Sequence, residues 1–380
     1  MKKIFSISNI LISIYFVCIC VIAVFAFRRP HYNWDMLAYM ALVVKLQHNN
    51  ISSDEVHEIT YTNAKKNVPA PEYSYLLGGE YRKSMAENST AFYNQLPFYI
   101  VKPLYIGLIY LFNKAGFSLP LSTALPSILS YLLIGVLLFY WLKKYLNAVL
   151  TFAISLLIMY SGFMVSIARE STPDCLSAFL LLTAFYFIIE KPSFRLMCFF
   201  LILSLFARLD NIITCGIIIS FLFYCKKTTL LISFKQYALT LFMLVCCYLC
   251  ITFLIRPFGW NMSFYDDFLS HLELLQGQNN TFSLSKYLSL AYSKIITSIV
   301  YHHITLFMIV IVFIVGYLPI VKFRELNFEQ LFSLLLVFII LIRFIIFPDL
   351  SDRFNIANYI FAIILLVKKY AGANVISAKI

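Results

Sequence analysis

"IFSISNILISIYFVCICVIAVFAFRRPHYNWD", residues 4–35, joins a long apolar run to two arginines, a proline and a single carboxylate, Asp35. The apolar part, residues 4–27, exceeds the ~20 residues that a membrane-spanning helix needs. It is also longer than the core of a signal peptide, and no cleavage site of small residues follows it. We therefore expect a retained first span, with Asp35 just beyond the membrane boundary.

The whole chain has the composition of a membrane protein. Of its 380 residues, 61% are hydrophobic and 13% are charged, with a mean hydropathy of +0.84. Soluble domains are about a quarter charged, so this composition excludes a water-soluble fold. The apolar runs lack the alternation of barrel strands, which predicts an all-α polytopic membrane protein. The net charge of +12 lies mostly in short clusters beside apolar runs, a pattern typical of topological anchors and not of nucleic-acid binding.

The basic clusters orient the apolar runs. If residues 98–112 do not cross, six basic clusters fall on the cytoplasmic side: Lys2-Lys3, Lys143-Lys144, Lys191 with Arg195, Lys226-Lys227, Lys322 with Arg324, and Lys368-Lys369. That run is short and interrupted by prolines, so we expect a re-entrant or interfacial helix there. About ten transmembrane helices remain, with both termini inside. Their predicted ranges are 4–27, 120–141, 147–167, 175–189, 196–207, 211–224, 230–255, 298–320, 327–347 and 354–367.

This topology gathers acids and arginines on the outer side, at the edge of the hydrocarbon. A channel or transporter would more often place such groups near the midplane, so the pattern indicates a site that opens outward. The large first outer loop, residues 28–118, contains segments with amphipathic patterns. Residues 33–48 in particular resemble an amphipathic helix lying along the membrane.

Three stretches resemble the GT-C glycosyltransferases, a group that includes protein O-mannosyltransferases and bacterial aminoarabinose transferases. They are Lys102-Pro103-Leu104-Tyr105, "ARESTPDCLSAFLLLTAFYF" at 168–187, and "LFARLDN" at 205–211. The resemblance implies a GT-C-like module over residues 1–255. Residues 256–380 then form a C-terminal membrane region with outer loop 256–297 and the last three spans. It also implies a polyprenyl-phosphate sugar donor, a lipid, glycan or protein acceptor, and a bacterial inner membrane with the site facing the periplasm.

Sugar transfer from a lipid phosphate needs a base for the acceptor hydroxyl and cations for the departing phosphate. We predict Asp35 as the catalytic base of an inverting transfer. The predicted phosphate-binding residues are Lys102, Arg169, Arg208 and Arg353, and the predicted supporting acids are Glu170, Asp174, Asp210 and Asp352.

Each of these residues also has a purely structural interpretation. Asp35 is placed to cap a helix, and Asp174 to begin one. Arg169 can pair with Glu170, and the pair Arg208–Asp210 can tie two short spans together. Arg353 can be a snorkelling anchor, although basic residues are disfavoured on outer faces.

The sequence lacks a glycine-rich phosphate loop and a nucleotide fingerprint, which favours a lipid-linked donor over a nucleotide sugar. No metal site is assigned. A divalent cation is compatible with Asp266, Asp267, His271 and Glu273, although an amphipathic loop helix explains their spacing better. Two other functions stay open: a polysaccharide polymerase or ligase of the O-antigen type, and a lipid-glycan flippase or transporter.

Overall fold

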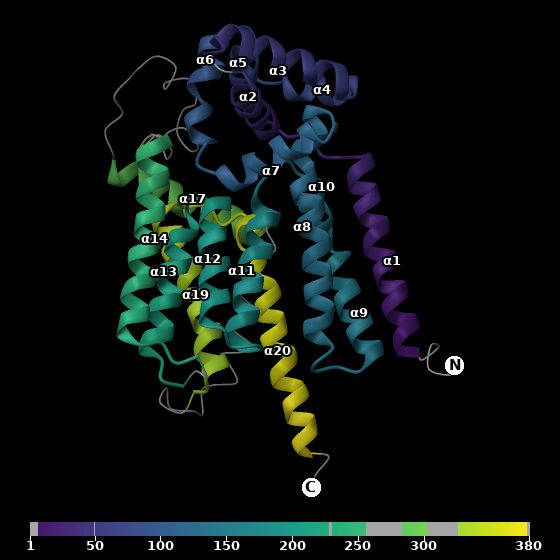
Figure 1. Cartoon of the computed structure of the whole chain (residues 1–380), viewed down its shortest axis with the longest axis vertical. Coiled ribbons are helices and arrows are strands. Elements are labelled where there is room, and N and C mark those ends of the chain that lie inside the picture. The colour runs from purple at the N-terminus through teal and green to yellow at the C-terminus, as the bar shows by residue number, and fades with distance from the viewer. Residues whose placement is uncertain (1–6, 49, 228–229, 256–282, 302–325, 378–380) are drawn as a thin grey trace.

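A computed structural model of the chain describes residues 7–48, 50–227, 230–255, 283–301 and 326–377. These residues form helices, and the β pairing within them is a single bridge between His31 and Glu170. Figure 1 shows two parts: a bundle of long helices, and a group of shorter helices lying over one end of it. The all-α prediction is confirmed for the described residues.

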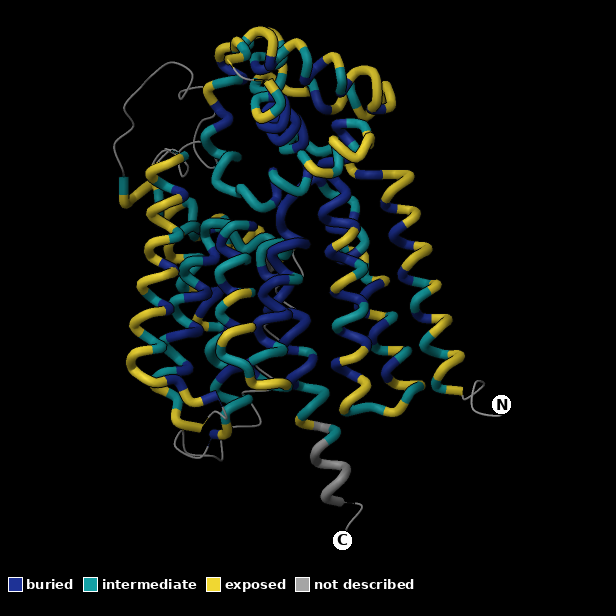
Figure 2. The backbone as a smooth tube through the Cα atoms, viewed as in Figure 1, coloured by how far each residue is buried: buried dark blue, intermediate teal, exposed yellow. Residues whose placement is uncertain are grey.

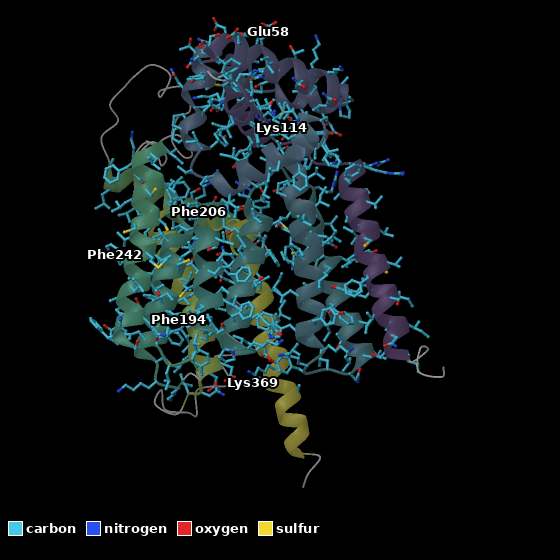
Figure 3. All side chains as sticks on the ribbon, in the orientation of Figure 1. Glu58, Lys114, Phe194, Phe206, Phe242 and Lys369 are labelled. Atoms are coloured by element: carbon cyan, nitrogen blue, oxygen red, sulfur yellow. The ribbon has the colours of Figure 1, made fainter. Side chains whose placement is uncertain are left out.

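The shorter helices form what we call the cap, residues 35–114. Its elements are α2 (Asp35–Gln47), α3 (Ser53–Asn67), α4 (Ala70–Leu76), α5 (Glu80–Glu87), α6 (Ser89–Asn94), η1 (Leu96–Phe98) and α7 (Pro103–Lys114). Figure 3 shows Glu58 of the cap and Lys369 at opposite ends of the molecule.

The remaining helices make up the bundle. They are α1 (Ile7–Arg28), α8 (Leu119–Leu142), α9 (Ala148–Met159), α10 (Gly162–Arg169), α11 (Asp174–Ile189), α12 (Phe194–Ala207), α13 (Asn211–Tyr224), α14 (Phe234–Ile255), α17 (Leu284–Tyr301), α19 (Phe328–Ile346) and α20 (Ile356–Ser377), with the short η3 (Asp352–Phe354) before the last.

Four of the described helices, α1, α8, α14 and α19, are long and apolar enough to cross a membrane. A fifth candidate is the pair α9 and α10, which is bent by 57° at its break. Helices α11, α12 and α13 are apolar but shorter; the 14 residues of α12 extend ~21 Å, against a hydrocarbon core of ~30 Å. These helices fit an integral membrane protein. The predicted span 298–320 lies mostly outside the described residues.

The outer surface of the bundle is apolar where a soluble protein would be polar. On α14, Phe242 is 66% exposed and Leu254 is 79% exposed. Figure 2 shows this exposure along α14 and α1 at the two flanks, whereas α11 between them is buried along most of its length. Exposed apolar faces of this extent fit contact with lipid.

The bundle has one continuous hydrophobic core, to which α8, α11, α19 and α20 all contribute. Helices α1 and α8 approach closely at Gly135, where the Tyr15 hydroxyl donates to the Gly135 carbonyl at 2.9 Å. At the end away from the cap, Lys144 and Lys368 both pair with Glu190, at 3.1 and 3.8 Å. The C-terminal ends of α8 and α11 therefore meet the middle of α20 there.

The cap has a second core, centred on α2. Every residue from Met36 to Val44 is buried, so this helix does not lie along the membrane as its sequence predicts. Helix α3 covers part of α2. It begins with a capping box between Ser52 and Glu55, and its buried face consists of Val56, Thr60, Tyr61 and Ala64, the spacing of one helix face. The buried position of α2 holds its first residue, Asp35, in a fixed place above the bundle.

Candidate functional site

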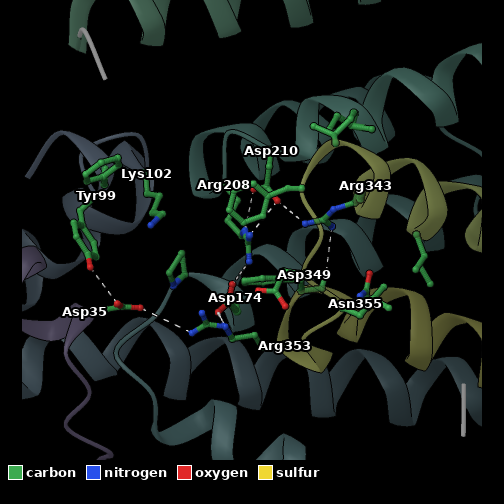
Figure 4. A pocket seen from close by; sticks show the side chains of 18 of the residues that line it. Asp35, Tyr99, Lys102, Asp174, Arg208, Asp210, Arg343, Asp349, Arg353 and Asn355 are labelled. Carbon is green, nitrogen blue, oxygen red and sulfur yellow. Dashed lines mark hydrogen bonds and ion pairs between the residues drawn. The ribbon is translucent and has the colours of Figure 1, made fainter. Parts of the chain in front are cut away.

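A cavity of about 350 Å³ lies between the cap and the tops of α11, α13 and α19. Its volume is in the range of small-molecule sites. Four acids and four bases line it: Asp35, Asp174, Asp210 and Asp349, with Lys102, Arg208, Arg343 and Arg353. Figure 4 shows these side chains converging from both parts of the molecule. Six of the nine residues predicted from the sequence are among them.

Asp35 faces this cavity as the first residue of α2. Asp35 does not cap the helix, because the N-cap position is Trp34, and it is the Asn33 Oδ1 that accepts from the Met36 amide at 3.2 Å. The Asp35 carboxylate instead accepts a long hydrogen bond of 3.4 Å from the Tyr99 hydroxyl and lies 3.9 Å from the Arg353 guanidinium. Neither contact is tight, which leaves the carboxylate accessible to a ligand.

Lys102 approaches the cavity from the start of α7. Its ammonium donates to the Tyr39 hydroxyl at 2.8 Å and lies 5.3 and 5.2 Å from the rings of Tyr39 and Tyr99. Among the described residues, no carboxylate lies within ion-pair distance of it. Burial lowers the pKa of Lys102, and the charge of Asp35 only partly opposes this. A cation held by a phenol and two aromatic faces is stabilised further by an incoming anion.

Arg208 fixes the short turn between α12 and α13. Its Nε and Nη2 donate to the Asp210 carboxylate, both at 3.0 Å, and its Nη1 pairs with Asp174 at the start of α11. Asp174 is only 3% exposed. Burial alone would raise the pKa of Asp210, but Arg208 and Arg343 hold it well below its usual range. The predicted pair Arg208–Asp210 is therefore present, and it also borders the cavity.

Arg353 lies on the loop between α19 and α20. Its Nε is 3.8 Å from Asp174, while its Nη1 reaches toward Asp35. The ring of Phe354 lies 4.8 Å from the Arg353 guanidinium and 4.2 Å from that of Arg208. Burial would lower the pKa of Arg353, but Asp174, Asp35 and Glu170 raise it. Arg353 thus bridges the acid on α2 and the acid on α11.

Sequence reasoning missed Arg343 on α19. Its guanidinium pairs with Asp210 and donates to the Phe354 carbonyl at 3.2 Å. It therefore ties the start of α13 to the loop that carries Arg353. A signal was present, because a lone arginine within an apolar span commonly marks a functional or structural polar site.

Asp349 was also missed as a site residue. One of its oxygens accepts the Ser351 amide at 2.8 Å, and it lines the cavity on the same loop as Arg353.

Three predicted residues do not line this cavity. The Arg169 Nε donates to the Arg29 carbonyl at 2.7 Å, and its guanidinium lies over the ring of Phe25. It secures α10 to α1 and does not point toward a phosphate site. Glu170 accepts from Ser166 at 3.0 Å, and burial raises its pKa despite the charge of Arg353. Asp352 accepts from the Tyr359 hydroxyl at 3.0 Å.

Hydroxyl groups of α8 hold the turn that presents Asp174. The Thr123 hydroxyl donates to the Ser171 hydroxyl at 2.7 Å, and Ser127 donates to the Thr172 carbonyl at 2.8 Å. Such bonds satisfy backbone and side-chain groups that have no access to water. They fix the direction in which the α11 N-terminus enters the cavity.

A metal site is not preassembled in the described part of the chain, where no three His, Cys, Asp or Glu side chains are grouped to hold an ion. Asp266, Asp267, His271 and Glu273 lie outside the described residues.

No family model matches this chain, and no curated protein or solved structure matches it. The function must therefore be inferred from the geometry of the cavity itself.

Proposed function

We propose that this protein is a membrane glycosyltransferase of the GT-C type. It transfers a sugar from a polyprenyl-phosphate donor to a lipid, glycan or protein acceptor. The observation that carries the proposal is that one cavity is lined by both Lys102 and Asp35. Lys102 forms no ion pair with a carboxylate of the described residues, and Asp35 is only loosely held. An anion site beside a free base is what such a transfer requires.

The reaction balances with these groups alone. The acceptor hydroxyl oxygen attacks the anomeric carbon, and its proton passes to the Asp35 carboxylate. The bond between that carbon and the phosphate oxygen breaks, and the phosphate leaves with the electron pair. A single base on the acceptor side gives inversion at the sugar.

The departing phosphate gains charge, and the cations stabilise it. Lys102 binds it directly, since its ammonium is not neutralised by a neighbouring acid. Arg353 can exchange its two contacts of 3.8 and 3.9 Å for the phosphate, because neither is of hydrogen-bond length. Arg208 keeps its bidentate bond to Asp210 and offers its remaining donors.

We further propose ten crossings, with the cap on the periplasmic side of a bacterial inner membrane. The lysines in the short loops at the end away from the cap support this orientation, because the positive-inside rule counts short loops. Helix α8 runs away from the cap, so Lys143 and Lys144 follow it at the far end, where Lys369 also lies (Figure 3).

The proposal is tested by replacing Asp35 in purified protein reconstituted with a sugar-linked polyprenyl phosphate. Asp35→Asn should lower kcat by about 10²- to 10⁴-fold, the usual contribution of a general base, with donor KM changed less. Asp35→Glu is the matched control and should retain more activity. Ordinary turnover by Asp35→Asn would show that the assigned base is wrong.

Vesicles that contain the reconstituted protein and the labelled donor also distinguish sugar transfer from transport. A flippase moves labelled carrier across the bilayer without making a glycosidic bond, and a polymerase extends a lipid-linked glycan by repeat units.

A further inference from the structure

We propose that the cap end of α1 binds an anionic phospholipid, with the phosphate of its headgroup at Arg28 and Arg29. The acyl chains of this lipid lie along the exposed face of α1. It is a lipid of the surrounding bilayer, separate from the proposed sugar donor and from the cavity. The inference therefore goes beyond the proposed function and does not depend on it.

Two arginines at the end of α1 are available to a ligand. Arg28 is the last residue of α1 and Arg29 follows it, and both are exposed. In the part of the chain that the structure describes, neither guanidinium forms an ion pair with a carboxylate. Glu170, which lies close by through its bridge to His31, accepts from Ser166 instead. Each guanidinium can therefore direct its N–H donors to phosphate oxygens, a pairing that is frequently bidentate.

Helix α10 holds the backbone that carries these arginines. The Arg169 Nε donates to the Arg29 carbonyl at 2.7 Å, and the His31 amide donates to the Arg169 carbonyl at 2.8 Å. The Arg169 guanidinium lies 5.1 Å from the ring of Phe25, which adds a third positive charge at this end of α1. Because the backbone is already fixed, a ligand does not have to order it on binding.

An exposed apolar stripe leads along α1 to Arg28. Its residues follow one another three or four positions apart, so they share one helix face: Ile10, Ile14, Val17, Val21 and Val24, which are 44–61% exposed. Figure 2 shows exposed segments along this helix at the flank of the bundle. Val17 lies about 16 Å farther from the cap than Arg28, close to the depth of one leaflet of a ~30 Å hydrocarbon core.

Charge complementarity selects an anionic phospholipid as the occupant. Its negative phosphate lies at the membrane interface, the level at which α1 ends in Arg28 and Arg29. Its acyl chains extend one leaflet into the bilayer, the depth that the stripe covers. A free phosphate ion would contact the arginines only, and in phosphatidylcholine the choline group neutralises the phosphate. The site therefore favours a lipid with net negative charge.

The test measures lipid binding to the full-length protein in a neutral detergent by native mass spectrometry. Wild-type protein should bind phosphatidylglycerol more tightly than phosphatidylcholine. A basic residue near a membrane surface strengthens such binding roughly fivefold. Arg28→Gln/Arg29→Gln should therefore weaken phosphatidylglycerol binding by about 30-fold, equivalent to about 2 kcal/mol. The single variants cover the case in which the double variant does not fold, and each should weaken binding about fivefold.

Lys65→Gln/Lys66→Gln is the matched control. It removes the same charge from an exposed basic pair in the last turn of α3, in the cap, and it should leave phosphatidylglycerol binding unchanged. Equal binding of the two lipids by wild-type protein would overturn the inference, as would wild-type affinity in the arginine variants or an equal loss in the lysine control. Inorganic phosphate that displaces the lipid would show a free-anion site instead. Sugar transfer is not measured, so none of these results bears on the proposed function.

Discussion

Lys102→Ala removes the cation that the proposed phosphate site depends on most. The Lys102 ammonium has a phenol and two aromatic rings as neighbours, and no carboxylate of the described residues forms an ion pair with it, so a bound phosphate would give it a direct one. A hydrogen bond to a charged group contributes about 1.5–3 kcal/mol. Its loss predicts a rise in donor KM of roughly 10- to 150-fold, with a smaller change in kcat.

The assay measures transfer at varied donor concentration, with Tyr39→Phe and Lys102→Arg as controls. Tyr39→Phe removes the hydroxyl that Lys102 donates to but leaves the positive charge, so donor KM should change only a few-fold. Lys102→Arg keeps the charge without the mobile ammonium and should restore part of the affinity.

The pH dependence gives an independent check. Burial lowers the pKa of Lys102, with Asp35 partly opposing, and the donor binds the protonated form. Donor kcat/KM should therefore fall as pH rises through the pKa of Lys102. This fall should occur below the pKa of an ordinary lysine, ~10.4. Lys102→Arg should lose this alkaline limb. Wild-type donor KM in Lys102→Ala, or an alkaline limb that persists in Lys102→Arg, would refute the reasoning.

Three further changes test other parts of the structure. Arg169→Gln should leave donor KM near wild type but lower the unfolding temperature, because its Nε holds the Arg29 carbonyl; a large rise in donor KM would return Arg169 to the phosphate site. Arg343→Gln should raise donor KM, because the buried Asp210 carboxylate loses a charged partner at a cost of about 1–3 kcal/mol. Arg343→Lys should restore part of the donor affinity. Gly135→Ala should destabilise by roughly 1 kcal/mol, because the added methyl would meet Ile19 at 3.1 Å; an unchanged unfolding temperature would contradict the close α1–α8 contact.

The sequence was a good guide to helix positions where apolar runs end in strong local signals. The predicted span 120–141 matches α8, Leu119–Leu142, and the predicted break at Arg208 separates α12 from α13. These boundaries follow from proline, from charged turns and from hydrophobic length, all of which act locally. The count of ten crossings stays a prediction.

The grouping of Asp35, Asp174, Arg208, Asp210 and Arg353 followed from sidedness, whereas Lys102 came from its motif beside Pro103. Charged residues at one membrane face are confined to the interface, so the topology places them in the same layer. Which of them point into one cavity depends on helix phase, which sidedness does not give.

Arg169 illustrates this limit. It stands in the same turn as Asp174, but it ends α10 whereas Asp174 begins α11, and the two side chains leave on different sides. Arg343 was hidden for the opposite reason, since it lies inside an apolar run and its partner Asp210 is far away in sequence. The burial of α2 likewise depends on cover from α3, which no local pattern of residues 33–48 records.

One measurement tests base-assisted transfer most directly: a single-turnover reaction with excess protein and a sugar labelled on its polyprenyl phosphate. Transfer in the cavity predicts equal amounts of released polyprenyl phosphate and of new glycosidic bond with inverted configuration. Asp35→Asn should bind the donor and form neither product. Recovery of the carrier with its sugar still attached, in wild-type protein supplied with acceptor, would contradict the proposed chemistry.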